Sequence, residues 1–242
     1  MARLEQFLFS EDVKLGSLAG ALATVWVHGP GAPGALEQSL DGASGLREWP
    51  QYRHGHVAFA GESLVLARID QLGVPGYCAY LSAGRHDDLV AALTASGALT
   101  VGPEALAAAR IEAAYPLFGV DMTADTIPLE AGIEPRAIST SKGCYVGQEV
   151  IIRVLHRGHG RVVRKLVSLR IYGQRPEQGA KLYVGDREVG FVTSAGESPR
   201  SGTIALGYAH RDFLSPGTEL EVETPLGRAP AIVTEVPVPS AV

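Results

Sequence analysis

The C-terminal part of this chain is a series of short strand-like segments with no helix between them, which restricts the fold more than any other feature of the sequence. From Thr218 to Thr224, apolar or small residues alternate with Glu219, Glu221 and Glu223, the pattern of a strand with one buried face. Comparable segments lie at 163–171, 181–184, 188–192 and 231–236. Short strands at this spacing predict a small barrel or sandwich.

The first half of the chain mixes strands with helices. Strands are expected at 23–28 and 77–81, and a hairpin at 56–69 around Gly61 and Glu62. Helices are predicted at 35–40, 87–95 and 103–113, where proline or glycine marks a helix end or acidic residues lie in the first turn. The sequence therefore predicts an α+β protein, with an α+β domain over residues 1–160 and a β-domain over residues 161–242.

Composition excludes several classes of protein. Hydrophobic residues make up 46% of the 242 residues and charged residues 19%, which suits a packed core and argues against disorder. The apolar stretches are short and interrupted, so no membrane contact is expected. The N-terminus has no apolar signal core, and Cys78 and Cys144 form no Cys-x-x-Cys pair. We therefore expect a protein of the reducing cytoplasm.

Residues 142–149, Lys-Gly-Cys-Tyr-Val-Gly-Gln-Glu, form a loop that no routine structural element requires. A solvated turn is the usual interpretation of a Gly-x-x-x-Gly segment, but cysteine and tyrosine are poor choices for an exposed turn. Lys142 would favour the thiolate of Cys144, which predicts a reactive group. The alternative is a buried thiol that acts as a small hydrophobe, which is the role expected for Cys78 in its apolar surroundings.

A metal site is not expected. A single cysteine cannot hold an iron–sulfur cluster alone, because such clusters take about four ligands. The pairs His54 with His56 and His156 with His159 have spacings that could ligate a metal. No cysteine or carboxylate cluster completes either pair, so surface histidines are the better interpretation.

A basic strip follows the loop. No acidic residue lies between Val150 and Pro176, whereas this window holds Arg153, Arg157, Arg161, Arg164, Lys165, Arg170 and Arg175. Two interpretations stay open. The strip is either a solvated face balanced by acids elsewhere, or an anion-attracting surface beside the Cys144 loop.

Four segments carry a family resemblance. They are Arg-Ile-Glu-Ala at 110–113, Ile-Pro-Leu-Glu-Ala-Gly at 127–132, the loop at 142–149, and Val-Gly-Phe-Val-Thr-Ser-Ala at 189–195. Together they resemble the YgfZ branch of the glycine cleavage T-protein (GcvT, aminomethyltransferase) superfamily, from about residue 3 to residue 235. The motif at 142–149 is specific, and the others support it.

The resemblance implies a GcvT/YgfZ-like α+β ring that surrounds tetrahydrofolate, including its polyglutamylated forms, followed by a small C-terminal β-barrel. It implies that Glu112 recognises the pterin, since a carboxylate can accept two parallel N–H bonds. Lys142 would pair with the glutamate of the folate. Tyr145 and Gln148 would complete the binding site, and Cys144 would be the reactive residue.

The family normally begins with a segment that precedes the part resembling Leu4 to Leu15. That segment contains a Gly-x-Asp-Ala-type helix start and an aspartate used in folate chemistry. We therefore expect the ring to be incomplete at its N-terminus.

The resemblance favours one function and leaves two others open. The first is a folate-binding accessory protein for iron–sulfur cluster assembly or maintenance, in which Cys144 reacts beside tetrahydrofolate. Its partners would be iron–sulfur client or assembly proteins, with an effect on tRNA modification. The alternative is a tetrahydrofolate-dependent aminomethyl (C1) transferase. The third, an RNA-binding or protein-interaction module that uses the basic strip, is disfavoured by the net charge of -5.

Overall fold

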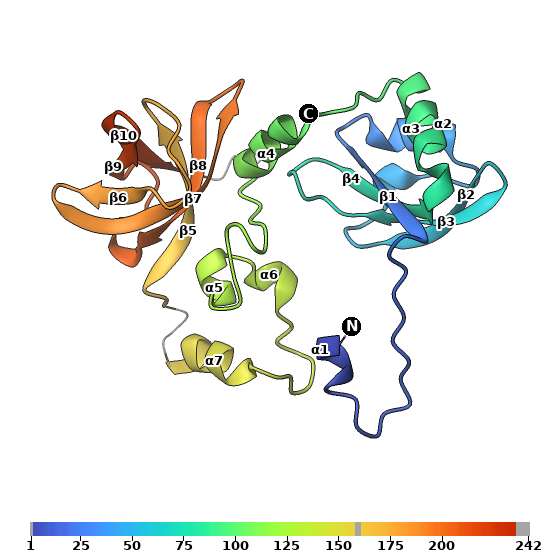
Figure 1. Ribbon diagram of the computed structural model, residues 1–242, viewed down its shortest axis with the longest axis horizontal. Helices are drawn as coiled ribbons and strands as arrows, with labels where there is room; N and C mark the ends of the chain where they lie inside the picture. Colours follow the sequence, from blue (N-terminus) through green and yellow to red (C-terminus); the bar gives the residue numbers. More distant parts are fainter. Residues whose placement is uncertain (1, 158–160, 236–242) are drawn as a thin grey trace. The chain divides into compact units, whose positions relative to one another are not determined.

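The structure is a computed structural model that describes residues 2–157 and 161–235. The chain forms two compact units, Met1–Thr100 and Val101–Val242 (Figure 1). Each unit has a hydrophobic core of its own. The domain boundary expected near residue 160 stays a prediction.

The first unit is a four-stranded antiparallel sheet with two helices packed on one face. After the short helix α1 (Ala2–Glu5), its strands are β1 (Leu22–His28), β2 (His54–Phe59), β3 (Glu62–Arg68) and β4 (Gly76–Ser82), in the order β1-β4-β3-β2. Its longer helices are α2 (Ala32–Ser39) and α3 (His86–Ala95). The hairpin predicted at 56–69 is confirmed as β2 and β3.

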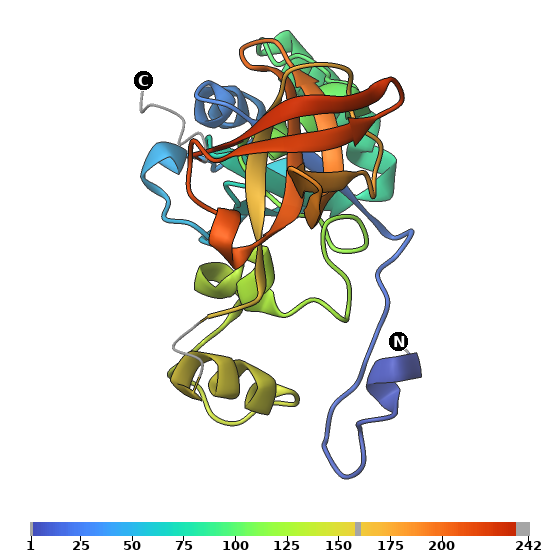
Figure 2. The same cartoon turned by 90° about the vertical axis from the view of Figure 1, so that its left-hand side faces the viewer.

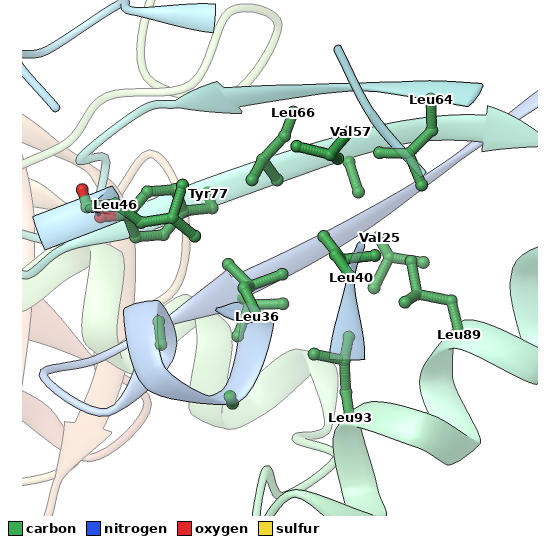
Figure 3. Close-up of a cluster of buried hydrophobic side chains, with 14 of the residues drawn as sticks. Val25, Leu36, Leu40, Leu46, Val57, Leu64, Leu66, Tyr77, Leu89 and Leu93 are labelled. Carbon is green, nitrogen blue, oxygen red and sulfur yellow. Dashed lines mark hydrogen bonds between the residues drawn. The ribbon is translucent and has the colours of Figure 1, made fainter. Parts of the chain in front are cut away.

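The core of this unit lies between the sheet and the helices α2 and α3. Figure 3 shows Leu36, Leu40, Leu89 and Leu93 pointing toward Val25 and the other apolar side chains of the sheet. Cys78 is fully buried in β4, which confirms its predicted role as a packing residue. This unit is held by apolar packing of the kind that stabilises most domain cores.

The second unit begins with helices. These are α4 (Pro103–Glu112), α5 (Pro128–Ala131), α6 (Glu134–Ala137) and α7 (Gln148–Ile152), followed by a π-helical turn over Arg153–Arg157. α4 begins at Pro103 as predicted, since proline suits the first turn. The shorter helices were not predicted. At 4 or 5 residues each, α5, α6 and α7 are too short to show a hydrophobic period.

The rest of the second unit is a closed antiparallel barrel. Its strands are β5 (Arg164–Ile171), β6 (Lys181–Val184), β7 (Arg187–Ser198), β8 (Gly202–His210), β9 (Glu219–Thr224) and β10 (Gly227–Thr234). Their order around the barrel is β10-β5-β8-β7-β6-β9, and closure leaves no open sheet edge. The α+β fold with a C-terminal barrel is therefore confirmed, while β8 is a strand that the sequence analysis did not predict.

α4 packs on the outside of this barrel, against β7 and β8 (Figures 1 and 2). Ile111 of α4 is buried with Ile204 and Leu206 of β8. Because alternate residues of a strand face opposite sides, the neighbours of these β8 residues point into the barrel. The outer face of β5, β7 and β8 is thus where side chains from the helical segment and from the barrel meet.

The longest helices in the described part of the chain, α3 and α4, have 10 residues each. A helix needs about 20 apolar residues to cross a bilayer, so none of the described helices could span one.

Candidate functional site

Asp121 is the centre of a buried network that joins the helical segment to the barrel. Its Oδ1 accepts hydrogen bonds from the hydroxyls of Thr193 and Ser194, each at 2.6 Å. Its Oδ2 accepts from the Arg110 guanidinium at 2.8 Å and from the Leu117 backbone N–H at 2.9 Å. The Asp121 side chain is fully buried. These four hydrogen bonds compensate the cost of burying the Asp121 carboxylate, and they leave its oxygens little capacity to bind a ligand.

This network fixes α4 on the barrel. Arg110 lies on α4 and donates a second hydrogen bond, at 2.7 Å, to Ser194 on β7. Since Glu112 follows two residues later on the same helix, the network also sets where Glu112 lies. Arg110 and Ser194 are 84 residues apart in sequence, and the structure brings them into direct contact.

Glu112 lies at the C-terminal end of α4 with one carboxylate oxygen bonded and the other open. The Ser198 hydroxyl donates to Glu112 Oε1. The Ser198 oxygen in turn accepts from the backbone N–H groups of Arg200 and Ser201, at 3.1 and 3.0 Å. These two donors leave the Ser198 proton directed at Glu112, so Ser198 orients the carboxylate. Glu112 Oε2 makes no hydrogen bond within residues 2–157 and 161–235.

A pocket of about 120 Å³ opens beside Glu112. Its walls combine apolar side chains, including Ile111 and Ile204, with Glu112, Ser168 and Arg170. Ser168 is buried, and its hydroxyl has no hydrogen-bond partner in the part of the chain that the structure describes. Buried polar atoms almost always have a partner, so an unsatisfied hydroxyl beside an open carboxylate oxygen is the arrangement expected of a binding pocket.

The loop at 142–149 is organised by contacts within itself and with Ser139. The Lys142 ammonium lies 4.9 Å from the centre of the Tyr145 ring, and the Lys142 backbone N–H donates to the Ser139 hydroxyl at 3.2 Å. The Tyr145 backbone N–H donates to Gln148 Oε1 at 3.3 Å. Gly147 has a φ of +85°, which glycine adopts readily, and it precedes helix α7. The structure therefore gathers Lys142, Tyr145 and Gln148 around one short turn.

Cys144 is exposed in this loop, whereas Cys78 is buried. Burial raises the pKa of the Cys78 thiol, which keeps it protonated and unreactive. Of the two thiols, Cys144 is the one that a solute can reach. The alternative interpretation of Cys144 as a buried packing residue is wrong.

Part of the basic strip is balanced by acids. Arg164 pairs with the buried Glu130 at 3.3 Å, and Lys165 lies 3.8 Å from Glu134. Both acids come from the segment of α5 and α6. These pairs support, for two of its members, the interpretation of the strip as charges balanced from elsewhere in the chain. His159, the partner predicted for His156 in a metal pair, lies outside the described residues.

The predicted binding residues thus fall in two places. Lys142, Tyr145, Gln148 and Cys144 share the loop, while Glu112 lines the pocket at the barrel. The sequence analysis did not identify Asp121, Ser168 or Ser198. Their signal was weak, since serine and aspartate are common in loops and at strand ends, and they acquire their positions only when the barrel closes.

Comparison with known proteins identifies two family domains in the chain. Residues 1–142 match the GCVT N-terminal domain, and residues 164–238 match the glycine cleavage T-protein C-terminal barrel domain. An aminomethyltransferase of Thermosynechococcus vestitus is 34% identical over 213 residues, and one of Shouchella clausii is 31% identical over 235 residues. These alignments cover 87% and 94% of this chain.

The solved structure of the glycine cleavage system aminomethyltransferase T from Bartonella henselae is also similar. It has a TM-score of 0.76 and 25% sequence identity, over 90% of this chain and 59% of that protein. The chain spans 57% of the length of the T. vestitus relative and 63% of the S. clausii relative. The similarity therefore extends along almost all of this chain but along only part of each relative.

These relatives overturn the function first expected. The sequence analysis favoured an accessory role in iron–sulfur cluster assembly, on the strength of the Cys144 loop. The relatives are instead named aminomethyltransferases, at 28–34% identity. The accessory role is therefore wrong, because a single exposed loop was given more weight than the similarity along the whole chain.

Proposed function

Because this chain belongs to the glycine cleavage T-protein family, we propose that it binds a reduced folate and takes part in folate-dependent transfer of an aminomethyl (C1) group. The observation that carries the proposal is the pocket beside Glu112, with its open carboxylate oxygen and its unpartnered Ser168 hydroxyl. The names of the similar aminomethyltransferases supply the reaction class.

The pocket fits one end of a folate. Its volume of about 120 Å³ is smaller than the roughly 300–1,000 Å³ of pockets that enclose a whole drug-sized ligand. It would therefore receive a ring, while the rest of the ligand stays outside. Ile111 and Ile204 offer apolar walls to a flat ring, and the polar groups lie among them.

In this proposal Glu112 recognises the pterin and Ser198 holds the carboxylate in place. A carboxylate can accept two parallel N–H bonds from an aminopyrimidine edge, and such charge-assisted bonds are the stronger ones. The hydrogen bond from Ser198 reduces the rotamer freedom that Glu112 would otherwise lose on binding. The unpartnered hydroxyl of Ser168 would form a hydrogen bond with the same ligand.

The loop at 142–149 supplies the remaining proposed residues. Lys142 would pair with the glutamate carboxylate of the folate, and polyglutamylated forms would add further anionic groups to that contact. Tyr145 and Gln148 would hold the turn that presents Lys142, and Cys144 would be the reactive group. Tetrahydrofolate, when bound, supplies the nitrogen atoms that accept the one-carbon unit. We also propose, on the basis of the same loop motif, that this chain belongs to the YgfZ branch of the family.

Calorimetric titration with tetrahydrofolate under anaerobic conditions tests the binding. We expect Glu112→Gln to weaken binding at least about tenfold, since it removes a charge-assisted contact. Ser198→Ala should weaken it about two- to fivefold, since Ser198 only orients Glu112. Glu197→Gln is the matched control. Glu197 lies next to Ser198 on β7 and accepts a hydrogen bond from Thr203, but it does not line the pocket. Absence of binding by the unmodified chain would overturn the proposal.

Transfer is tested separately, by formation of methylene-tetrahydrofolate from an aminomethyl donor. We expect Cys144→Ala to lower the rate while leaving the folate affinity unchanged, since its thiol is exposed in the loop and does not line the Glu112 pocket. An unchanged rate in that variant would remove Cys144 from the reaction. Binding without any transfer would limit the function to folate recognition.

A further inference from the structure

A second pocket, of about 260 Å³, opens on the barrel where β5, β7 and β8 lie side by side. Its lining differs in chemistry from that of the Glu112 pocket. Two guanidinium groups, Arg164 and Arg187, and the imidazole of His210 face it together with the rings of Phe191 and Tyr208. None of these residues lines the pocket beside Glu112.

The cations of this pocket are held on aromatic faces. The Arg164 guanidinium lies 5.0 Å from the centre of the Tyr208 ring and 5.6 Å from that of Phe191. The Arg187 guanidinium lies 5.6 Å from the centre of the Phe213 ring. Cation–π contacts of this kind restrain a long side chain, so an anion that binds here finds donors already in position and less freedom is lost.

Most charged groups of the lining are paired, and His210 Nδ1 also lies 3.2 Å from a carboxylate oxygen of Asp212. Glu188, the acidic residue of the lining, pairs with Lys181 at 2.8 Å. Arg164 pairs with Glu130, which does not line the pocket. Arg187 has no carboxylate within 4.0 Å among the residues that the structure describes. Its five N–H donors are therefore available to an anion.

Phe191 gives the pocket a half-buried aromatic ring, and Tyr208 lies almost fully buried behind it. The Phe191 and Tyr208 rings lie 5.6 Å apart and are tilted by 36°. Val163 and Val189 line the pocket beside them. A ring that lies beside Phe191 gains apolar contact, while a carboxylate on the same ring reaches the guanidinium donors.

We propose that this pocket binds a small planar anion, an aromatic carboxylate, with the ring beside Phe191 and the carboxylate on Arg187. The site is separate from the folate function proposed above, because it uses none of the residues assigned there. Bidentate pairing with a carboxylate is the geometry that a guanidinium provides best.

Titration of the full chain with benzoate, followed by NMR chemical shifts, tests the proposal without any pterin. We expect a dissociation constant of about a millimolar, which is ordinary for a ligand of this size. Benzamide, which has the ring without the charge, and cyclohexanecarboxylate, which has the charge without the flat ring, should each bind at least about fivefold more weakly. Equal binding of the three compounds would overturn the proposal.

Arg187→Gln should weaken benzoate binding about tenfold. Arg228→Gln is the matched control: Arg228 also lies over a ring of the barrel, 3.7 Å from the centre of Tyr183, but does not line the pocket. It should leave the affinity unchanged. Equal losses in both variants would show general charge attraction and overturn the site, as would the absence of binding up to about 10 mM. Arg187 is exposed, so its replacement should leave the thermal unfolding curve in place.

Discussion

Two carboxylates on the outer face of the barrel, Asp121 and Glu112, have opposite surroundings. Asp121 is fully buried and accepts hydrogen bonds from a guanidinium, two hydroxyls and a backbone N–H. Glu112 is half-buried and accepts one hydrogen bond, from Ser198. Its second oxygen remains open beside a pocket.

The difference separates a structural acid from a binding acid. A saturated carboxylate holds its neighbours in place and has little left to offer a ligand, whereas a carboxylate with an open oxygen next to an apolar wall can exchange water for a ligand. Asp121 accordingly stabilises the position of α4, and Glu112 uses that position. The following experiments test whether this division holds.

The largest effect is expected for Asp121→Ala. The substitution leaves the buried Arg110 guanidinium and the Thr193 and Ser194 hydroxyls without their acceptor. Breaking a buried ion pair on one side costs about 3–5 kcal/mol. We therefore expect the free energy of unfolding, measured with urea, to fall by about that amount.

Asp125→Ala is the matched control for this experiment. Asp125 lies in the same segment and its side chain is exposed, so we expect a change within about 0.5 kcal/mol. A loss below about 1 kcal/mol for Asp121→Ala would mean that the network does not hold α4. The comparison between Asp121 and Glu112 would then lose its basis.

The sequence predicted most strands of the barrel and the helix α4. Alternation of glutamates with apolar residues in 218–224 predicted β9, whose Leu220 and Val222 are buried and whose glutamates are exposed. β8 escaped prediction because most of its residues, from Ile204 to Ala209, are buried on both faces and show no alternation. The alternation of apolar and polar residues is absent where α4 covers the outer face of a strand.

Fewer features of the site than of the fold could be predicted from the sequence. Glu112 was predicted through its family motif, but Asp121, Ser168 and Ser198 carry no local pattern. Their roles depend on contacts between segments far apart in the chain: Thr193 is 72 residues from Asp121, and Ser198 is 86 residues from Glu112. Such pairs become visible only once the barrel and α4 are in place.

Tyr208 is a buried polar residue whose hydroxyl makes no hydrogen bond of ordinary geometry in the described part of the chain, although the Thr126 side chain lies close enough to lower its pKa slightly. Removing an unsatisfied buried hydroxyl avoids its desolvation penalty. We therefore expect Tyr208→Phe to raise the free energy of unfolding by up to about 1 kcal/mol at pH 7. A loss of more than about 1 kcal/mol would show that the hydroxyl is satisfied in solution.

The same variant has a predictable pH dependence. Burial, followed by the nearby Glu130, raises the pKa of Tyr208 from 10.0 to about 12. The unfolded chain releases this proton near pH 10, whereas the folded chain keeps it up to about pH 12. The shifted ionisation of Tyr208 therefore does not lower the free energy of unfolding below pH 10. It lowers the free energy of unfolding of the unmodified chain as the pH rises from about 10 to about 12. Tyr208→Phe should lose about 2–3 kcal/mol less than the unmodified chain across this window.

The smallest effect is expected in the loop at 142–149. Gly147 has a φ of +85°, and no atom would meet an added Cβ within 4 Å, so alanine there adds backbone strain and no clash. The strain of about 1–2 kcal/mol falls on a loop whose neighbouring Val146 is 95% exposed. The loop can relax without unpacking a core. We therefore expect Gly147→Ala to change the free energy of unfolding by less than about 0.5 kcal/mol.

Gly185→Ala is the matched substitution in the barrel. Gly185 has a φ of +59° and is equally free of neighbours within 4 Å, but it lies in the turn that joins β6 and β7. The pairing of these strands holds the turn, so the strain cannot relax, and a loss of about 1 kcal/mol is expected. Equal losses at both glycines would place the loop within the cooperative core.

Alkylation of the two cysteines gives a second measure of the loop. An open loop predicts rapid alkylation at Cys144 and none at the buried Cys78 while the protein is folded. A loop that belongs to the cooperative core predicts slow alkylation at Cys144.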